Sequence, residues 1–514
     1  MNANSGDAEA LIVPSKLLGV LHHAGCEEPG YAEAVNASGA VRAVSAALRT
    51  HRHSLYTLFA AAAEALHLMV NVLECDATAA CELGAPEVLL AGLPLALRTP
   101  EPGNVTHTVD TICGAVMALL DEEDVMAARL ARLGRRMLCD LAAALMLRCP
   151  ASTGSTRNIC TLLMVFTTWS PVDEVAAASS YISTSLQTML QGASQPNVQY
   201  AGWSAFKALL NRDEAACARA VADDLVSVAT QSLERLAQSP LEQESHDNMF
   251  NAMGIVCDIL RLLITAQTLG RDAVSAVAVA SVAALRLHGT ADHLFAVRAL
   301  ALMGTLVMKH QWSMRLVVAE GGLVAVVSAM EAHPGVLGVY VQGMTSLAYL
   351  VITALSSEEF GRSAAEKARR LADTGVIEVL ANALRTHVRG AEAVDFLKCI
   401  IDTLAWVCSG AANGPNRSDP WLQPCVAARA ARAGVGAAIT AAMARAPAMT
   451  GYAPGVALAA AVDCVPAPRA CDGCGTVEAP KLMLCARCRT ARFCGAACQR
   501  AAWAEHKKAC VPPK

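Results

Sequence analysis

Eight cysteine and histidine residues occupy the stretch 471–510 in four close pairs. The pairs are Cys471-x2-Cys474, Cys485-x2-Cys488, Cys494-x3-Cys498 and His506-x3-Cys510. A Cys-x2-Cys pair turns the chain so that both sulfurs face one centre, and residues four apart share one face of a helix. Sets of four thiolate and imidazole donors suit Zn²⁺, which is redox-inert. The spacing predicts two zinc ions, and by itself it permits sequential or crossed pairing.

Protein ligands fill both predicted sites, so no position is open for a reactive water. Closed coordination of this kind argues against hydrolytic zinc chemistry. A segment this short cannot be held together by apolar burial, so metal binding must supply its folding free energy, about 10 kcal/mol per ion. The zinc is therefore expected to be structural.

Further residues around these ligands complete a familiar pattern. Phe493 precedes Cys494, Gln499 follows Cys498, and Trp503 lies three positions before His506-Lys507. The pattern resembles the MYND zinc finger; the HIT-type finger has a similar cysteine order but lacks the Gln-x3-Trp-x2-His-Lys phrase. The resemblance implies crossed pairing. One zinc would then be held by Cys471, Cys474, Cys494 and Cys498, and the other by Cys485, Cys488, His506 and Cys510.

Gln499 and Trp503 are four residues apart, so they are expected on one face of a short helix. In MYND fingers the corresponding residues contact short proline-containing peptides, and the resemblance implies a peptide-binding face here. Such peptides suit an aromatic face because the extended polyproline helix is already ordered before binding. The alternative is that Trp503 packs between the two zinc sites.

The rest of the 514-residue chain has a composition that favours helices. Hydrophobic residues make up 54 %, aromatic residues 4 % and charged residues 17 %, so the core must be built mainly from Ala, Val, Leu and Met. Alanine has the highest intrinsic helix propensity, and a chain this apolar is not a disordered one. No period-two alternation runs for more than a few residues. Residues 1–463 are therefore expected to be all-α.

A recurring ten-residue phrase indicates repeats within this helical body. A glycine is followed by Val, Leu or Ile at plus five, a small residue at plus eight and Leu or Met at plus nine. The phrase begins at Gly39, Gly84, Gly321, Gly375 and Gly434. Glycine lets one helix end and the next begin at a steep angle, and the plus-five and plus-nine side chains share the buried face.

The phrase and its spacing resemble armadillo and HEAT repeats, most clearly at 320–355. The resemblance implies a superhelix of stacked helices with a concave partner-binding groove. No clean copy of the phrase occurs between residues 95 and 311. Two interpretations remain for that stretch: about five degenerate repeats, or an inserted helical bundle of another kind.

The joint between the repeats and the finger is rich in proline. Pro447, Pro454, Pro466 and Pro468 mark residues 446–470 as a hinge region, with 464–470 as the linker itself. Residues 511–514 form a short tail after the last predicted zinc ligand.

Basic residues gather around the predicted zinc ligands. Residues 465–514 contain nine Lys or Arg and three Asp or Glu. Seven thiolates and two Zn²⁺ lower the formal charge of this segment from +6 to +3. That charge is low for a surface that binds the phosphate backbone of a nucleic acid. Nucleic-acid or chromatin binding is nevertheless the alternative function, and it would use Arg487, Arg489, Arg492 and Arg500.

The remaining 13 cysteines are scattered, and the polar N-terminal segment lacks the basic and apolar regions of a secretory signal. Reduced thiols in the cytoplasm or nucleus are expected. The uncharged runs 175–206 and 334–357 are long enough to span a bilayer. Their polar residues and glycines favour buried repeat helices, so no membrane partner is expected.

No catalytic motif is evident in the sequence. The chain lacks a Gly-Lys-Ser/Thr phosphate loop, a Gly-x-Ser-x-Gly elbow, a His-Glu-x-x-His helix and the Asn-His-Ser-Cys-like phrase of SET lysine methyltransferases. The expected function is a non-enzymatic adaptor whose finger binds a protein partner through a short proline-containing motif. A SET-type methyltransferase with an unrecognised domain is the third hypothesis.

Overall fold

The computed structural model describes most of the helical body and part of the C-terminal finger. The described residues are 31–51, 56–67, 70, 78–98, 102–119, 138–146, 153–213, 224–240, 246–266, 269–358, 360–387, 394–412, 422–465, 483–485, 491–493 and 496–510. They divide into two compact units, Met1–Leu316 and Val317–Lys514, which are described separately.

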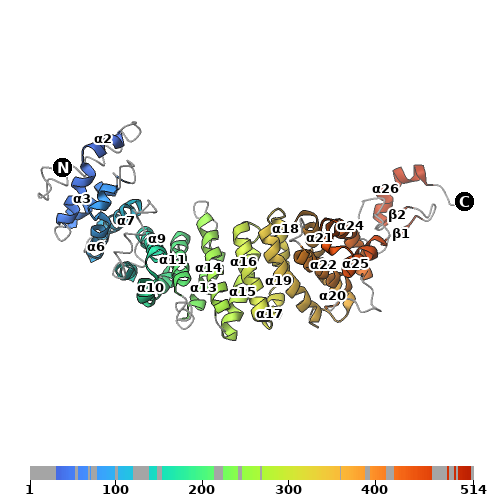
Figure 1. The fold of residues 1–514 in the computed structure, drawn as a ribbon. Helices are drawn as coiled ribbons and strands as arrows, with labels where there is room; N and C mark the ends of the chain where they lie inside the picture. The colour runs from blue at the N-terminus through green and yellow to red at the C-terminus, as the bar shows by residue number, and fades with distance from the viewer. Residues whose placement is uncertain are drawn as a thin grey trace. The chain divides into compact units, whose positions relative to one another are not determined.

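The described part of the N-terminal unit is built from helices (Figure 1). In chain order they are α2 (Tyr31–Ala37), α3 (Ala40–His51), α4 (Tyr56–His67), α5 (Thr78–Glu82), α6 (Ala85–Arg98), α7 (Pro102–Leu119), the helical segment 138–146, α9 (Thr153–Trp169), α10 (Val172–Gly192), α11 (Pro196–Arg212), α13 (Leu225–Gln238), α14 (His246–Ala266), α15 (Arg271–His288) and α16 (His293–Lys309). Helix α17 (Ser313–Ala319) spans the boundary between the units.

These helices pack in two layers. One layer runs without interruption through α4, α7, α9, α11, α14 and α16, each contacting the next, and Figure 1 shows the last four side by side. In the other layer α3 contacts α6, and α10, α13 and α15 contact in turn. An ion-pair chain links three helices of the first layer: Asp258 of α14 lies 2.6 Å from Lys207 of α11 and 3.8 Å from Arg298 of α16.

This packing decides between the two interpretations of residues 95–311. The described helices of that stretch continue the same two layers, as α6 and α7 give way to α9, α10, α11, α13 and the pairs that follow. The stretch therefore consists of degenerate repeats, and the alternative of an inserted bundle is wrong for these helices.

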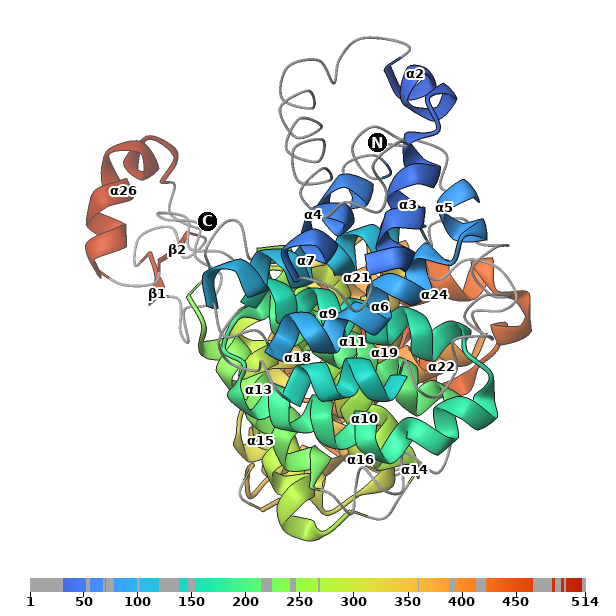
Figure 2. The ribbon, with the colours of Figure 1, turned by 90° about the vertical axis from the view of Figure 1, so that its left-hand side faces the viewer.

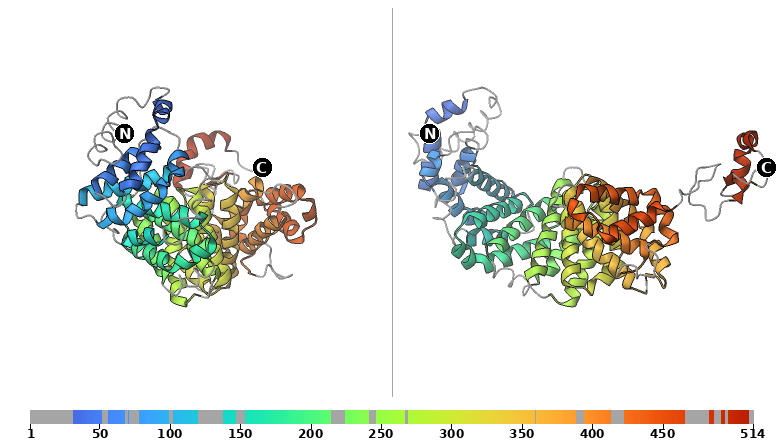
Figure 3. Two further views of the ribbon diagram at one scale, coloured as in Figure 1. Left: turned by 60° about the vertical axis from the view of Figure 1, so that its left-hand side comes forward. Right: turned by 45° about the vertical axis from the view of Figure 1, so that its right-hand side comes forward.

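The C-terminal unit shows the repeat in its full form, three helices at a time (yellow to red in Figure 3). Its elements are α18 (Gly322–Ala332), α19 (Leu337–Ser356), α20 (Ala364–Asp373), α21 (Val376–Thr386), α22 (Val394–Ser409), α23 (Pro424–Arg432), α24 (Val435–Arg445), the 3-10 helix η5 (Pro447–Met449), α25 (Ala453–Asp463), β1 (Met483–Leu484), β2 (Arg492–Phe493) and α26 (Ala496–Ala509). Helices α18, α21 and α24 contact in sequence, as do α19, α22 and α25.

The glycine phrase marks the start of the second helix in each triplet, as the sequence predicted. All five glycines have left-handed φ values: 70° at Gly39, 73° at Gly84, 83° at Gly321, 89° at Gly375 and 64° at Gly434. The plus-five side chain is buried at all five copies, and the plus-nine side chain at all but the last, where Met443 is half-buried; Leu380 and Leu384 in α21 show the pattern. At Gly375 a Cβ would lie 2.7 Å from the Glu331 carboxylate, which would have to move, while the left-handed φ would strain any side chain there.

A sixth copy of the phrase begins at Asp224, within the stretch where the sequence showed none. Asp224 has φ 59° and is the one non-glycine residue with positive φ in the described part of the chain. Helix α13 starts directly after it, with Ala229 at plus five, Ser232 at plus eight and Leu233 at plus nine, all buried. The sequence rule required glycine and a larger aliphatic residue at plus five, so it missed this copy.

The predicted hinge at 446–470 is wrong over most of its described length. Helix α25 spans Ala453–Asp463, buries Leu458, Ala459 and Val462, and packs against α22 and α24. Its Pro454 occupies the first turn, where the missing N–H would have no partner within the helix in any case. Pro454 thus begins the last repeat helix instead of breaking the array. Residues 466–470 lie outside the described residues.

Two described helices, α14 and α19, are long and apolar enough to cross a membrane by length and composition. Most of each apolar stretch is buried within its own unit: α14 contacts α11, α13 and α16, and α19 contacts α18, α20 and α22. The interpretation of 334–357 as a buried repeat helix is therefore confirmed. The other run, 175–206, is broken into α10 and α11 by an extended segment at 193–195.

Cysteines of the body contribute to the core as thiols. Cys113, Cys160, Cys257 and Cys408 are buried and form no disulfide. Burial raises the pKa of Cys408 to about 12, so its thiol is protonated and packs as a small apolar group.

Candidate metal centre and peptide face

A small hairpin and one helix position the described residues of the finger (Figure 2). Strands β1 and β2 pair antiparallel, with Met483 opposite Phe493 and Leu484 opposite Arg492. The amide N–H of Cys485 donates to the carbonyl oxygen of Ala491 at 2.9 Å and extends the ladder by one residue. The hairpin therefore fixes Cys485 at the end of β1, and α26 contacts β2.

Three predicted ligands meet beside this hairpin. The donor atoms of Cys485, His506 and Cys510 all lie within 4.8 Å of one another. His506 is on α26, and Cys510 directly follows the helix end. Only 1 % of Cys485 and 5 % of Cys510 is exposed, and Ala491, Cys498 and Ala502 pack around them. Two residues from the helix end and one from the hairpin thus converge on one buried point.

The spacing of these donors fits a tetrahedral zinc ion. The Sγ atoms of Cys485 and Cys510 are 3.8 Å apart, far beyond a disulfide bond. Two sulfurs bound at about 2.3 Å to one tetrahedral ion are separated by about 3.8 Å. Two thiols and an imidazole facing one another in a buried cluster are also the donor types that Zn²⁺ prefers.

The composition of this cluster bears on how the ligands pair. Sequential pairing would put Cys485 with the first pairs and His506 and Cys510 with the later ones. The structure instead places Cys485 with His506 and Cys510, which is the grouping of the crossed arrangement. Cys498 lies on α26, half-buried, outside the group of three. The other predicted ligands, Cys471, Cys474, Cys488 and Cys494, lie outside the described residues.

Gln499 and Trp503 lie on the same side of α26, as the sequence predicted. Together with Arg500 they line an open depression of about 340 Å³. Trp503 is 37 % exposed, and its ring centroid lies 5.7 Å from that of His506. The indole is therefore partly exposed and lies beside His506, one of the predicted zinc ligands. Arg500, which the sequence suggested for nucleic-acid binding, lines this depression, a position that the sequence did not predict.

The family model described as the MYND finger matches residues 471–510. This segment is a MYND finger. It accordingly binds zinc, and the cluster of Cys485, His506 and Cys510 gives the described part of a ligand set. The MYND finger also explains why a 14-residue helix of low apolar content is folded: its ends are tied to buried ligands.

Other comparisons bear on the helical body. No curated protein matches the sequence. A solved structure of an engineered protein matches 89 % of this chain and 96 % of its own, with 14 % identity and a TM-score of 0.53, which is a likeness of fold alone. A second solved structure comes from work on a conserved phosphorylation switch that controls the interaction between cadherin and beta-catenin. It matches 88 % of this chain and 93 % of its own at 14 % identity and a TM-score of 0.49.

The fold prediction is confirmed in its main features. The body is an armadillo-like array of helical repeats, and the MYND finger follows it.

Of the four arginines proposed for nucleic-acid binding, the structure describes the side chain of Arg500 alone. Arg500 is exposed on α26, and Arg492 lies in β2 with no described side chain. Arg487 and Arg489 lie outside the described residues.

Proposed function

We propose that the protein is a non-catalytic adaptor: a helical-repeat scaffold whose MYND finger binds a partner through a short proline-containing motif. The observation that supports this proposal is the position of Trp503. Its indole is partly exposed and forms one wall of a depression that also contains the Gln499 side chain.

The chemistry of this face suits a polyproline segment. A proline ring can stack on the exposed indole, and the side-chain amide of Gln499 has both a donor and an acceptor for the peptide backbone. Polyproline backbone makes no internal hydrogen bonds, so its carbonyls are open to such a partner, and little entropy is lost on binding.

We further propose that the finger holds two structural zinc ions in the crossed arrangement. Cys485, Cys488, His506 and Cys510 would hold one ion, and Cys471, Cys474, Cys494 and Cys498 the other. The zinc would supply folding free energy, while the peptide face lies on the outer side of α26. We propose a reducing compartment for the protein, either the cytoplasm or the nucleus, because an oxidising one would convert the zinc-binding thiolates into disulfides.

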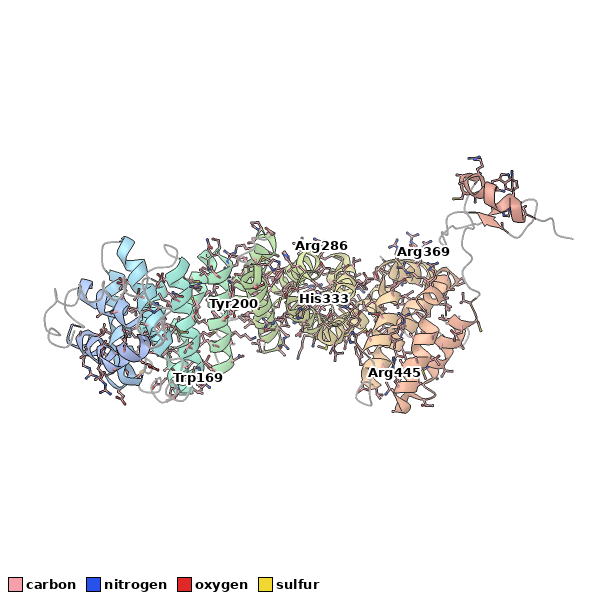
Figure 4. All side chains as sticks on the ribbon, turned by 90° about the horizontal axis from the view of Figure 1, so that it is seen from above. Trp169, Tyr200, Arg286, His333, Arg369 and Arg445 are labelled. Atoms are coloured by element: carbon pink, nitrogen blue, oxygen red, sulfur yellow. The ribbon has the colours of Figure 1, made fainter. Side chains whose placement is uncertain are left out.

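The test compares two tryptophan variants that have the same native exposure. Trp503→Ala should abolish binding of fluorescently labelled decapeptides that carry two prolines, while the zinc content stays unchanged. Trp169→Ala, at the end of α9 and also 37 % exposed (Figure 4), should leave peptide binding intact. Loss of zinc from the Trp503 variant would instead support a packing role for the indole.

A further inference from the structure

The depression on α26 contains a cation beside its aromatic residue. Arg500 is exposed and lines the depression with Gln499 and Trp503. Arg500 lies three positions before Trp503, so the two side chains are neighbours on adjacent turns, with Cβ atoms about 5–6 Å apart. A ligand that covers the indole must therefore lie next to a guanidinium.

A second cation lies on the same face of α26. At about 100° per residue, Gln499, Arg500 and Lys507 fall within about 60° of Trp503 around the helix axis. Glu505 is the one acidic residue in the sequence of α26. Lys507 is exposed one turn beyond the indole. The aromatic residue is thus bordered by positive charge on both sides along the helix.

We propose that this finger selects proline-containing peptides that carry an aspartate or glutamate close to the docked proline, and that Arg500 is the residue that reads the carboxylate. The inference rests on the proposed peptide-binding function of the finger. Guanidinium and carboxylate form charge-assisted hydrogen bonds, often in pairs, so an acidic residue gains more at this position than a neutral one.

Geometry limits where the carboxylate must lie. A polyproline segment advances about 3.1 Å per residue. With the proline on Trp503, a residue two or three positions away is displaced by about 6–9 Å, which lies within the combined reach of an arginine and a glutamate side chain. An acidic residue many positions away would not meet Arg500.

The gain should be modest because Arg500 is exposed. Ion pairs in water are screened by salt and weakened by the cost of holding two long side chains in place. At low ionic strength we expect an acidic peptide to bind about 3–10-fold more tightly than its neutral counterpart, with the preference shrinking at about 0.5 M salt.

The experiment uses the full chain with bound zinc and three labelled decapeptides. Each has two prolines, and they differ at one position, two residues from a proline: Glu, Gln or Lys. Wild type should prefer the Glu peptide, and Arg500→Glu should prefer the Lys peptide. The matched control is Lys507→Glu, which makes the same charge change on α26 outside the depression and should keep the Glu preference. Zinc content is measured for each variant.

Each other outcome overturns the inference in a distinguishable way. Equal binding of the Glu and Gln peptides by wild type would refute carboxylate selection but leave the proline-binding function standing. If Lys507→Glu and Arg500→Glu lose the preference for the Glu peptide equally, the general positive charge of α26 causes the preference, and Arg500 does not contact the carboxylate specifically. If no peptide binds, or if duplex DNA binds instead with Arg500 dependence, both the inference and the proposed function fail.

Discussion

The guanidinium of Arg385 donates a hydrogen bond to the backbone carbonyl oxygen of Ala433, the residue directly before Gly434. Arg385 stands ten positions after Gly375, so the arginine of one repeat reaches the joint of the next. In the N-terminal unit Arg49, ten positions after Gly39, donates in the same way to Leu83, directly before Gly84. The carbonyl in each case follows a short first helix, α23 or α5. A cation at that point satisfies an otherwise open carbonyl and opposes the helix dipole.

Removing this arginine should loosen the joint between two repeats. We expect Arg385→Ala to lower the local stability of α23 by about 1 kcal/mol, the typical net value of one hydrogen bond. Hydrogen exchange of the α23 amides measures this opening directly, since a long chain does not unfold in one two-state step. The control is Arg369→Ala, an exposed arginine of α20 for which the described residues show no hydrogen bond (Figure 4). Unchanged protection in Arg385→Ala would contradict a stabilising role.

Contacts also run in the opposite direction along the array. Arg445, on α24, donates at 2.5 Å to the carbonyl oxygen of Leu384 near the end of α21. Arg235, on α13, donates to the carbonyls of Leu190 and Gln191 near the end of α10. In both cases the arginine lies eleven positions after the residue that begins its repeat phrase, Gly434 or Asp224. This shared position is independent support for treating Asp224 as the start of a repeat.

The sequence predicted the repeats wherever chemistry required glycine, and failed where another residue meets the same requirement. At Gly375 the φ of 89° strains any residue that has a Cβ, so glycine is visible in the sequence. At Asp224 the same left-handed turn is made by an aspartate, one of the few residues that tolerates it. The inter-repeat role of Arg385 could not be predicted either, because it depends on where the next repeat packs.

Asp224 should carry backbone strain that glycine would relieve. We expect Asp224→Gly to stabilise the α13 region by about 0.5–1 kcal/mol, because glycine adopts left-handed φ without a Cβ clash. The gain is measured as slower hydrogen exchange in α13 and a higher urea midpoint for the N-terminal unit.

A second variant separates backbone strain from charge at this position. Asp224 lines a depression between α13 and α15 that also contains the carboxylates of Glu234 and Asp272, so losing its charge could stabilise the region as well. Asp224→Asn removes the charge but keeps a residue that tolerates the turn. If Asn stabilises as much as Gly, charge repulsion is the cause and the strain interpretation is wrong.

The last repeat should lose stability at high pH through one tyrosine. The hydroxyl of Tyr452 donates to the Asp402 carboxylate at 2.7 Å and joins α25 to α22. Burial, then the hydrogen bond and charge of Asp402, raise the pKa of Tyr452 to about 12. A phenol whose pKa is raised by folding contributes its full stability below its unfolded pKa of about 10 and loses it as pH approaches 12.

The Tyr452→Phe variant isolates this effect from other groups that titrate at high pH. We expect wild type to lose stability between pH 10 and 12 more steeply than the variant, and the variant to be weaker at neutral pH because Asp402 loses its partner. Urea unfolding of both proteins at pH 8, 10 and 11 gives the comparison. Parallel curves across this range would show that Tyr452 does not titrate with folding.

The metal site was predictable because its information is local. Ligand types and spacings over residues 471–510 identify the site before any fold is known. The hairpin that positions Cys485 was not predictable, because strands of two residues leave no periodic pattern. The place of Arg500 in the depression was not predicted for another reason: it depends on the neighbours of Arg500 on α26, which its charge alone does not reveal.

Removing zinc should unfold the finger and leave the repeats intact. Three donors held within 4.8 Å of one another in a buried cluster would be left without the ion that brings them together, and a segment of this size has little other core. Because each structural zinc supplies folding free energy of about 10 kcal/mol, chelation should abolish hydrogen-exchange protection in α26. Helices α18 to α25 bury their own apolar layers and should keep their protection and their far-UV signal. Adding Zn²⁺ back should restore α26, whereas Mg²⁺, which prefers oxygen ligands, should not. If α26 stays protected in the presence of a strong chelator, its fold does not depend on metal and the structural role of zinc is refuted.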